Sequence, residues 1–470
     1  MQILVHNFWL YSASRHSYIY YAIQILYFRF VNKRLYSFVK RLKPKILYFK
    51  RFFLLRYFTY LCKKLLNLIP EIKIEDFNYF LPDERIAKFP LEKRDSSKLL
   101  VYRDGVITDD TFSNLVDYLP ESTFLVRNNT KVVPARLYFK KESGAIIEIL
   151  CLSPVEPNDY VLSFASVGSC SWRAVVGNLK KWKDVDLEYF NPNSNVAESL
   201  GFKVELVERG AECVVKFKWN PPFTFSEVLE ECGKVPIPPY LNRESEQIDK
   251  TRYQTVYAYS EGSIAAPTAG LHFTPEVFSR LKSKNIEIED LCLHVGAGTF
   301  KPVKSEYISE HNMHREPFSL TKEFLQKLLK AKLDKRGLFS VGTTSTRTLE
   351  SLYYIGVNCI RNGQPSVVEQ WAPYSEDYKY SLKDSLEAIL EYLEKNNLNR
   401  LVGGTSIIIV PGFDFKVVDM QLTNFHQPQS TLLLLIAAII GDSWRDVYAH
   451  ALEHDYRFLS YGDSSLLFNH

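Results

Sequence analysis

Three histidines stand in segments rich in glycine, threonine and proline, and their side chains could exchange protons near neutral pH. They are His272 in "APTAGLHF", His294 in "LHVGAGTF" and His426 in "TNFHQPQST". Small changes in the surroundings of an imidazole move its pKa across the physiological range. An aromatic residue within six positions of each histidine could stack on a purine or face a cation. These aromatic residues are Phe273, Phe300 and Phe425. The alternative for any single histidine is a structural role in the core.

Small polar clusters follow four apolar runs in the C-terminal half of the chain. The runs span residues 288–295, 338–342, 406–410 and 417–422, and the clusters span 296–300, 342–345, 411–413 and 423–426. In an open α/β sheet, ligands bind beyond the carboxyl ends of the strands. Glycine and threonine also serve ordinary turns and helix caps, so a single cluster is weak evidence. Four clusters together favour a ligand pocket at one edge of a sheet.

The elements that must position these residues follow from apolar periodicity. Helical spacing occurs at 275–284, 321–335, 344–355, 383–396, 429–440 and 444–454. Helices that alternate with apolar runs predict an α/β fold with a layered, largely parallel sheet. The run "STLLLLIAAII" is apolar all round but too short to cross a bilayer, so we expect a buried core helix.

Residues 137–235 have a different pattern. Short runs such as "AIIEIL", "FKVELVE" and "ECVVKFKW" alternate with a period of two and are separated by turn residues. This pattern predicts a small antiparallel β-barrel inserted into the α/β domain. We therefore expect a catalytic α/β domain made of residues 71–136 and 236–470, with the barrel domain formed by residues 137–235.

Sequence motifs for metals and nucleotide cofactors are absent. His311, His314, His450 and His454 are the candidate metal ligands, but the chain lacks His-Glu-x-x-His and any Cys-x-x-Cys pair. "VGAGTF" is not the dinucleotide fingerprint Gly-x-Gly-x-x-Gly, and no Gly-Lys-Ser/Thr loop occurs. We therefore expect no bound metal, and neither ATP nor NAD finds support as a cofactor.

The charge distribution separates residues 1–70 from the rest of the 470-residue chain. This stretch holds 13 lysines and arginines and no acidic residue, whereas the remaining 400 residues carry 45 basic and 54 acidic side chains. A polyanionic partner would need a local basic patch on this main body. Residues 91–100 and 127–137 mix basic and small polar side chains, and they are either RNA-backbone contacts or solvated loops. The seven unpaired cysteines suit a reducing compartment, so we expect a cytoplasmic protein.

The first 70 residues are crowded with aromatic, aliphatic and basic side chains, as in "YFKRFFLLRYF". Their longest uncharged runs, 1–14 and 16–28, fall short of a transmembrane helix. We expect translated upstream sequence that forms no part of the folded enzyme, although no methionine lies between Met1 and Met313. A membrane-surface or RNA-binding arm and a divergent targeting segment are the alternatives.

Several motifs, taken together and in order, make the chain similar to a known family. They run from about Asp76 to Phe468 and include "LEKRDSSKLL", "NNTKVVPARL", "PIPPY", "APTAGLHF", "LHVGAGTF", "VGTTSTRTLES", "TNFHQPQSTL" and "YRFLSYGD". The chain resembles the S-adenosylmethionine:tRNA ribosyltransferase-isomerases of queuosine biosynthesis. The resemblance implies an α/β body with an inserted barrel. It also implies that the ribosyl part of S-adenosylmethionine is transferred to 7-aminomethyl-7-deazaguanine in tRNA, which gives epoxyqueuosine-tRNA, adenine and methionine.

The resemblance also implies partners and site residues. S-adenosylmethionine is a consumed substrate, tRNA with the 7-aminomethyl-7-deazaguanine wobble base is the acceptor, and we expect a monomer without a separate cofactor or obligate protein partner. The candidates for proton transfer are His272, His294, His426 and Asp463, with individual roles left open. The candidates for substrate binding are Asn128, Arg136, Thr268, Gly270, Phe273, Gly296, Gly298, Thr299, Phe300, Thr343, Arg347 and Asn424. The alternatives are a metal-dependent nucleotide hydrolase built on the histidines and a non-catalytic RNA-binding protein that uses the barrel.

Overall fold

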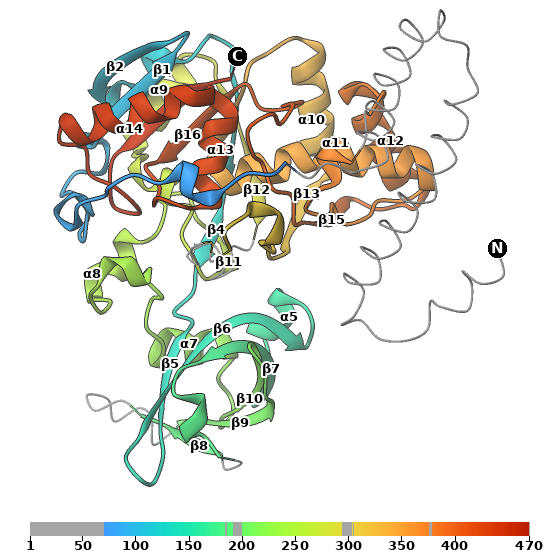
Figure 1. The fold of residues 1–470 in the computed structure, drawn as a ribbon. Coiled ribbons are helices and arrows are strands. Elements are labelled where there is room, and N and C mark those ends of the chain that lie inside the picture. The colour runs from blue at the N-terminus through green and yellow to red at the C-terminus, as the bar shows by residue number, and fades with distance from the viewer. Residues whose placement is uncertain are drawn as a thin grey trace, which may run out of the picture. The chain divides into compact units, whose positions relative to one another are not determined.

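A nine-stranded sheet and a closed six-stranded barrel are the main β-structures of the computed structural model (Figure 1). The structure describes residues 70–183, 186–190, 200–293, 303, 305–375 and 378–469. In spatial order the strands of the sheet are β15 (Arg400–Thr405), β13 (Glu316–Thr321), β12 (Glu287–Leu293), β3 (Phe124–Asn128), β14 (Leu338–Val341), β16 (Met420–Asn424), β17 (Ser464–Phe468), β1 (Lys98–Arg103) and β2 (Val106–Thr111).

The middle of this sheet is parallel and its flanks contain antiparallel pairs. Strands β12, β3, β14 and β16 all run in one direction. On one side β13 is antiparallel to both β12 and β15, and on the other β17 is antiparallel to β16 while β2 is antiparallel to β1. The expected parallel arrangement is therefore confirmed for the centre, and the sheet as a whole is mixed. The carboxyl ends of the four central strands lie at one edge.

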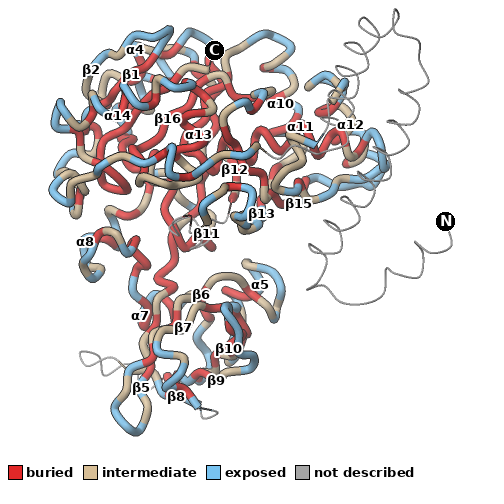
Figure 2. Tube along the Cα trace, in the orientation of Figure 1, coloured by how far each residue is buried: buried red, intermediate tan, exposed pale blue. Residues whose placement is uncertain are grey.

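Helices cover both faces of the sheet. One face carries α10 (Lys322–Leu333), α11 (Thr343–Asn362), α12 (Leu382–Lys395), α13 (Thr431–Ile440) and α14 (Trp444–Glu453), and the other carries α4 (Leu115–Tyr118) and α9 (Pro275–Ser283). Alternate side chains of β3 show the two layers, because Phe124 and Val126 pack with the first group and Leu125 packs with the second. Strands β14 and β16 are buried along their length, and β3 and α13 are buried over most of theirs (Figure 2).

Local sequence explains where these helices begin. The Thr274 hydroxyl accepts a hydrogen bond from the Val277 amide at the start of α9, and Pro275 occupies the first turn. Ser381 and Asp384 form a reciprocal capping box at the start of α12. The helices expected from periodicity are confirmed, and α13 is a buried core helix. Among the described residues, no helix is long and apolar enough to cross a membrane.

The apolar run at residues 406–410 does not form the strand that the sequence predicts. Strand β15 ends at Thr405, and the run continues from it as a buried segment without regular structure. Its backbone bonds to side chains and to the irregular segment at residues 368–370, where the Ser406 amide donates to the Val368 carbonyl at 2.9 Å and the Ile408 amide donates to the Gln370 carbonyl at 3.2 Å. The Ile407 carbonyl accepts from Arg347 at 2.9 Å, and the Val410 amide donates to the Tyr374 hydroxyl at 3.0 Å. The apolar composition of the run reflects its burial, and a buried run need not form a strand.

The barrel is antiparallel throughout. Its strands, in spatial order, are β10 (Cys213–Lys218), β7 (Ser169–Val176), β6 (Ile146–Glu156), β5 (Arg136–Lys140), β8 (Leu187–Tyr189) and β9 (Lys203–Glu208). Phe139, Phe202 and Phe217 are buried inside it, with ring centroids 5.3–6.3 Å apart. The remaining elements are α5 (Tyr160–Phe164), α7 (Phe225–Cys232), α8 (Gln247–Arg252) and the pair of short strands β4 (Thr130–Val132) and β11 (Ser260–Ser263).

Candidate active site

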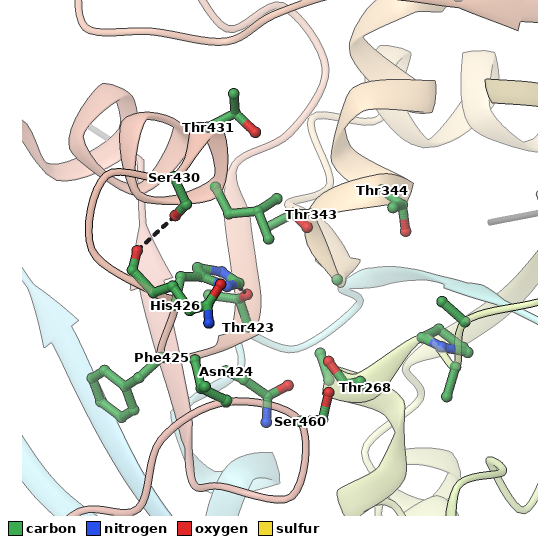
Figure 3. Close-up of a pocket in the computed structure, with 18 of the residues that line it drawn as sticks. Thr268, Thr343, Thr344, Thr423, Asn424, Phe425, His426, Ser430, Thr431 and Ser460 are labelled. Atoms are coloured by element: carbon green, nitrogen blue, oxygen red, sulfur yellow. Dashed lines mark hydrogen bonds between the residues drawn. The ribbon is translucent and has the colours of Figure 1, made fainter. Parts of the chain in front are cut away.

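A pocket of about 90 Å³ lies where the central strands β14 and β16 end (Figure 3). Residues 342–344 and 423–427, which follow these two strands, form part of its wall. Residues 265–269 and the start of α13 complete it, together with Tyr240, Leu459 and Ser460. Two of the four predicted clusters therefore meet in one pocket. The cluster at 411–413 is not in the wall, because the run before it is not a strand of the sheet.

Two helices begin at the pocket wall. Helix α11 starts at Thr343 after Gly342, whose φ of 90° is a conformation that glycine adopts without strain. Helix α13 starts at Thr431 after the N-cap Ser430. The first turn of a helix has unpaired backbone N–H groups and the positive end of the helix dipole. The wall is therefore suited to a carboxylate or another anion, and the threonine hydroxyls add donors and acceptors for a polar ligand.

His426 lies in the pocket wall itself. Its Nε2 is 2.9 Å from the hydroxyl of Thr423, and its backbone N–H donates to the Tyr448 hydroxyl at 3.1 Å. Burial lowers the pKa of this imidazole to about 3, so the ring is neutral at pH 7. A neutral imidazole can accept a hydrogen bond or a proton from a ligand.

His272 lies directly behind the wall and reaches it through Asn424. Its Nδ1 is 2.8 Å from the Ser97 hydroxyl, and its Nε2 is 3.3 Å from the amide nitrogen of Asn424, which lines the pocket. Burial, followed by the charge of Arg457, lowers the pKa of His272 to about 3. The Asn424 Oδ1 is buried and has no partner within the described part of the chain. This amide oxygen can therefore accept a hydrogen bond from a ligand.

Arg347 is engaged in a buried ion pair and does not line the pocket. Its Nη1 donates to Glu316 at 2.7 Å, and its Nε donates to the Ile407 carbonyl. Arg347 and Glu316 are 5% and 1% exposed, so each needs the other to compensate its buried charge. The structure places Arg347 where it holds the segment after β15 against α11.

The Asp463 side chain binds two backbone N–H groups. Its carboxylate accepts from the amide of Lys98 at 3.1 Å and from the amide of Arg457 at 2.8 Å. Burial raises its pKa, and these two bonds oppose the shift. Its oxygens therefore fix the start of β1 and the turn before β17, and its side chain is not in the pocket wall.

Four other predicted residues also have packing or strand-pairing roles. Asn128 donates to the Leu293 carbonyl at 3.0 Å and accepts from the Leu293 amide at 3.2 Å, which ties β3 to β12. At Gly270 a Cβ would lie 2.1 Å from a tyrosine hydroxyl, so only glycine fits. Phe273 is fully buried among aromatic rings on the α9 face. Arg136 belongs to barrel strand β5 and forms an ion pair with Glu148 at 3.4 Å.

Of the predicted site residues, Thr268, Thr343, Asn424 and His426 meet in the wall (Figure 3). His294, Gly296, Gly298, Thr299 and Phe300 lie outside the described residues. The sequence interpretation missed Tyr240 and Ser460, whose hydroxyls are 2.6 Å apart, and it missed Ser430 and Thr431. Thr344 and Thr423 lie in the polar clusters that the sequence placed at the pocket. The family motifs could have identified Tyr240, which ends "PIPPY", and Ser460, which lies in "YRFLSYGD".

Asp109, His450 and His454 form a group that could hold a metal ion. One ligand atom from each lies within 4.8 Å of the others. His450 Nε2 is 2.8 Å from the Asp109 carboxylate, and His454 Nδ1 is 2.9 Å from the His450 carbonyl. These contacts involve one ring nitrogen of each histidine, and the three residues do not line the pocket. His314, the other candidate ligand with a defined partner, contacts Glu316 at 3.1 Å.

The fold and the pocket define an α/β protein that carries an additional β-barrel and a polar ligand site at the carboxyl edge of its central strands. A family model described as queuosine biosynthesis protein matches residues 74–467. The chain belongs to this family.

Relatives with curated names agree with this membership. A protein of Sulfurihydrogenibium sp. is 38% identical over 401 residues, which cover 84% of this chain and 100% of the relative. A protein of Aquifex aeolicus is 36% identical over 401 residues with the same coverage. Both are named S-adenosylmethionine:tRNA ribosyltransferase-isomerase, which is the name of an enzyme. A solved structure of S-adenosylmethionine tRNA ribosyltransferase from Thermotoga maritima is 28% identical, covers 83% of this chain and 99% of its own, and has a TM-score of 0.40.

Proposed function

We propose that this enzyme transfers and isomerises the ribosyl part of S-adenosylmethionine onto 7-aminomethyl-7-deazaguanine in tRNA. The products are epoxyqueuosine-tRNA, adenine and methionine. One observation carries the proposal beyond the family name: the segments that bear the family resemblance also build the pocket. "APTAGLHF", "VGTTSTRTLES" and "TNFHQPQSTL" come from three distant parts of the chain, and each supplies residues to the same wall.

The pocket wall offers groups that match the polar parts of S-adenosylmethionine. The amino-terminal ends of α11 and α13 suit the methionine carboxylate. This assignment differs from the sequence interpretation, which offered Arg347, because Arg347 lies outside the pocket wall and its Nη1 is paired with Glu316. The hydroxyls of Thr268 and Thr343 can bond the ribose hydroxyls, and the Asn424 Oδ1, which has no partner among the described residues, can accept from an amino group.

The reaction requires proton transfers that the pocket can supply. The sulfonium of S-adenosylmethionine acidifies its 5′-carbon, so a base removes a proton there, and adenine leaves once it is protonated. The acceptor amine attacks as the neutral form. His426 lies in the pocket wall, and its neutral imidazole can exchange a proton with the substrate. His272 acts on the same wall through Asn424.

The remaining parts of the proposal concern the state of the protein. We propose a monomer that acts in the cytoplasm and uses no separate cofactor or catalytic metal. The described cysteines are all free thiols, which suits a reducing compartment. The donor chemistry needs no Lewis acid, because the sulfonium already carries the activating charge.

A direct test incubates the full chain with S-adenosylmethionine and tRNA that carries the precursor base. The tRNA is then digested, and the anticodon nucleoside is weighed by mass spectrometry. We expect the nucleoside to become epoxyqueuosine, with one adenine and one methionine released per transfer. The variant His454→Gln, which changes a histidine outside the pocket, should react like the wild type.

Two outcomes would reject the proposal in favour of an alternative. Tight tRNA binding without consumption of S-adenosylmethionine would indicate an RNA-binding protein. Nucleotide hydrolysis that a chelator abolishes would indicate a metal-dependent hydrolase.

A further inference from the structure

A second, smaller pocket adjoins the first one at Ser460. Its volume is about 20 Å³, and its wall includes Arg94, Arg252, Arg457 and His272. Ser460 lines both pockets, and His272 contacts Asn424 in the wall of the first. A volume of this size holds about one water molecule. A single oxygen of a larger anion fits there.

Backbone carbonyls hold two of these arginines in place. Arg94 donates to the carbonyls of Leu271 at 3.0 Å and Thr251 at 2.9 Å. Arg252 donates to the carbonyl of Glu92 at 3.0 Å, and its Nε is buried without a partner among the described residues. Carbonyl bonds orient a guanidinium but leave its charge uncompensated. The two side chains are therefore preorganised for a further acceptor.

No carboxylate within the described part of the chain forms an ion pair with Arg94 or Arg252. The contrast is local, because the neighbouring Arg243 donates two 2.8 Å bonds to Asp249. Arg457 forms an ion pair with Asp463, in which Nη2 lies 3.5 Å from Oδ1. Burial and the charge of Arg252 lower the pKa of Arg94 to about 10, so it still carries its charge at pH 7. Two like charges held close together favour an anion between them.

We propose that Arg94 and Arg252 bind a phosphate of the tRNA strand close to the nucleotide that is modified. The proposal deepens the proposed function and rests on it for the identity of the nucleic acid. A guanidinium matches phosphate oxygens through paired N–H donors. S-adenosylmethionine carries no phosphate, so the acceptor strand is the substrate that supplies one. The position of His272 between the two pockets places this phosphate beside the wall that holds the donor.

The structure also distinguishes the two basic segments that the sequence offers for RNA. Arg94 belongs to the segment at residues 91–100 and faces the small pocket. In the segment at 127–137, Arg127 is paired with Asp290 at 2.6 Å and stacks on the Tyr257 ring. The first segment therefore keeps an uncompensated charge for a phosphate, whereas Arg127 in the second is already neutralised.

The test uses Arg94→Gln and Arg252→Gln in the full chain, with Arg445→Gln as the matched control. Arg445 is half-exposed, pairs with Asp442 and lines neither pocket. Binding of precursor tRNA is measured over a series of salt concentrations, and steady-state kinetics give kcat and the KM for S-adenosylmethionine at saturating tRNA. We expect each pocket variant to bind tRNA about tenfold more weakly. The slope of log affinity against log salt should fall by roughly 0.7 to 0.9 per lost phosphate contact.

A conservative variant keeps the test informative if a glutamine variant fails to fold. Arg94→Lys retains the charge but loses the guanidinium fork, so the salt slope should persist while affinity falls. Unchanged tRNA affinity and salt slope in all pocket variants would overturn the proposal. A raised KM for S-adenosylmethionine with normal tRNA binding would overturn it as well, because the pocket would then hold the methionine carboxylate.

Free inorganic phosphate could bind the same two arginines, because it offers the same oxygen atoms as a tRNA phosphate. If inorganic phosphate raises the melting temperature of the wild type but not of Arg94→Gln, while tRNA binding is equal in both, the occupant is a free anion and the proposal fails. The binding measurement does not require turnover. A wild-type protein that does not consume S-adenosylmethionine but shows the arginine-dependent salt slope would refute the proposed function and support the phosphate site.

Discussion

Replacing His272 by asparagine and by glutamine separates proton transfer from positioning, because each amide retains a different contact of the imidazole. Asparagine places its amide near Nδ1 and keeps the 2.8 Å contact with Ser97. Glutamine reaches toward Nε2 and keeps the 3.3 Å contact with Asn424. Neither amide can shuttle a proton near neutral pH. We expect both variants to lose turnover if His272 exchanges protons with the substrates.

The structure sets the expected magnitudes. Each variant loses one buried hydrogen bond, worth about 0.5 to 1.5 kcal/mol, and part of the packing against Phe112, whose ring lies 5.0 Å away. The free energy of unfolding should therefore fall by about 1 to 3 kcal/mol. Loss of a proton-transfer group lowers kcat by roughly a hundredfold to ten-thousandfold, which raises the barrier by about 2.7 to 5.4 kcal/mol. Turnover should suffer more than stability.

The assay is single-turnover formation of the modified nucleoside, with the melting temperature of each variant measured in parallel and His454→Gln as control. If glutamine alone restores wild-type kcat, His272 is a positioning residue that acts through Asn424. If both variants keep wild-type kcat, His272 packs the core and its assignment to proton transfer is wrong. A collapse of the melting temperature in both variants would support a structural role.

Four further outcomes are expected. S-adenosylhomocysteine should not act as a donor, because a thioether lacks the charge that acidifies the 5′-carbon; ribosyl transfer from it would remove this basis. Activity should survive prolonged chelation, and a loss that one divalent ion restores would contradict the expectation. A chain that begins near Pro70 should keep its kcat, because the pocket residues all lie beyond it; a folded truncation without turnover at saturating tRNA would refute this. The pKa of both His272 and His426 is lowered to about 3, so the stability that they contribute is present above about pH 6.5 and lost as the pH falls toward 3. Denaturant unfolding should therefore give a lower free energy of unfolding at pH 5 than at pH 7, and the variant His426→Gln should reduce this difference.

The sequence by itself determined the family, the positions of helices α9 to α14 and the all-β character of the barrel strands. These features are local, since periodicity, caps and turn residues act within a few positions of the chain. Thr274 with Pro275 and Ser381 with Asp384 mark helix starts that the structure contains. The two clusters at 342–345 and 423–426 also meet, because parallel strands deliver their carboxyl ends to one edge.

Only the tertiary structure decided which polar side chains face the pocket and which serve packing. Asn128, Gly270 and Asp463 stand in motifs like those of Thr268 and Asn424, yet they tie strands together or fill close contacts. The run at 406–410 looked like a strand, because burial of its apolar side chains leaves the same pattern whether its backbone pairs with a strand of the sheet or with an irregular segment and side chains. The hydrogen-bond partner of a buried side chain often comes from a segment distant in sequence. Ser97 and His272, which contact each other, are 175 residues apart. A local sequence pattern cannot predict a contact between residues that far apart, so only the folded structure reveals it.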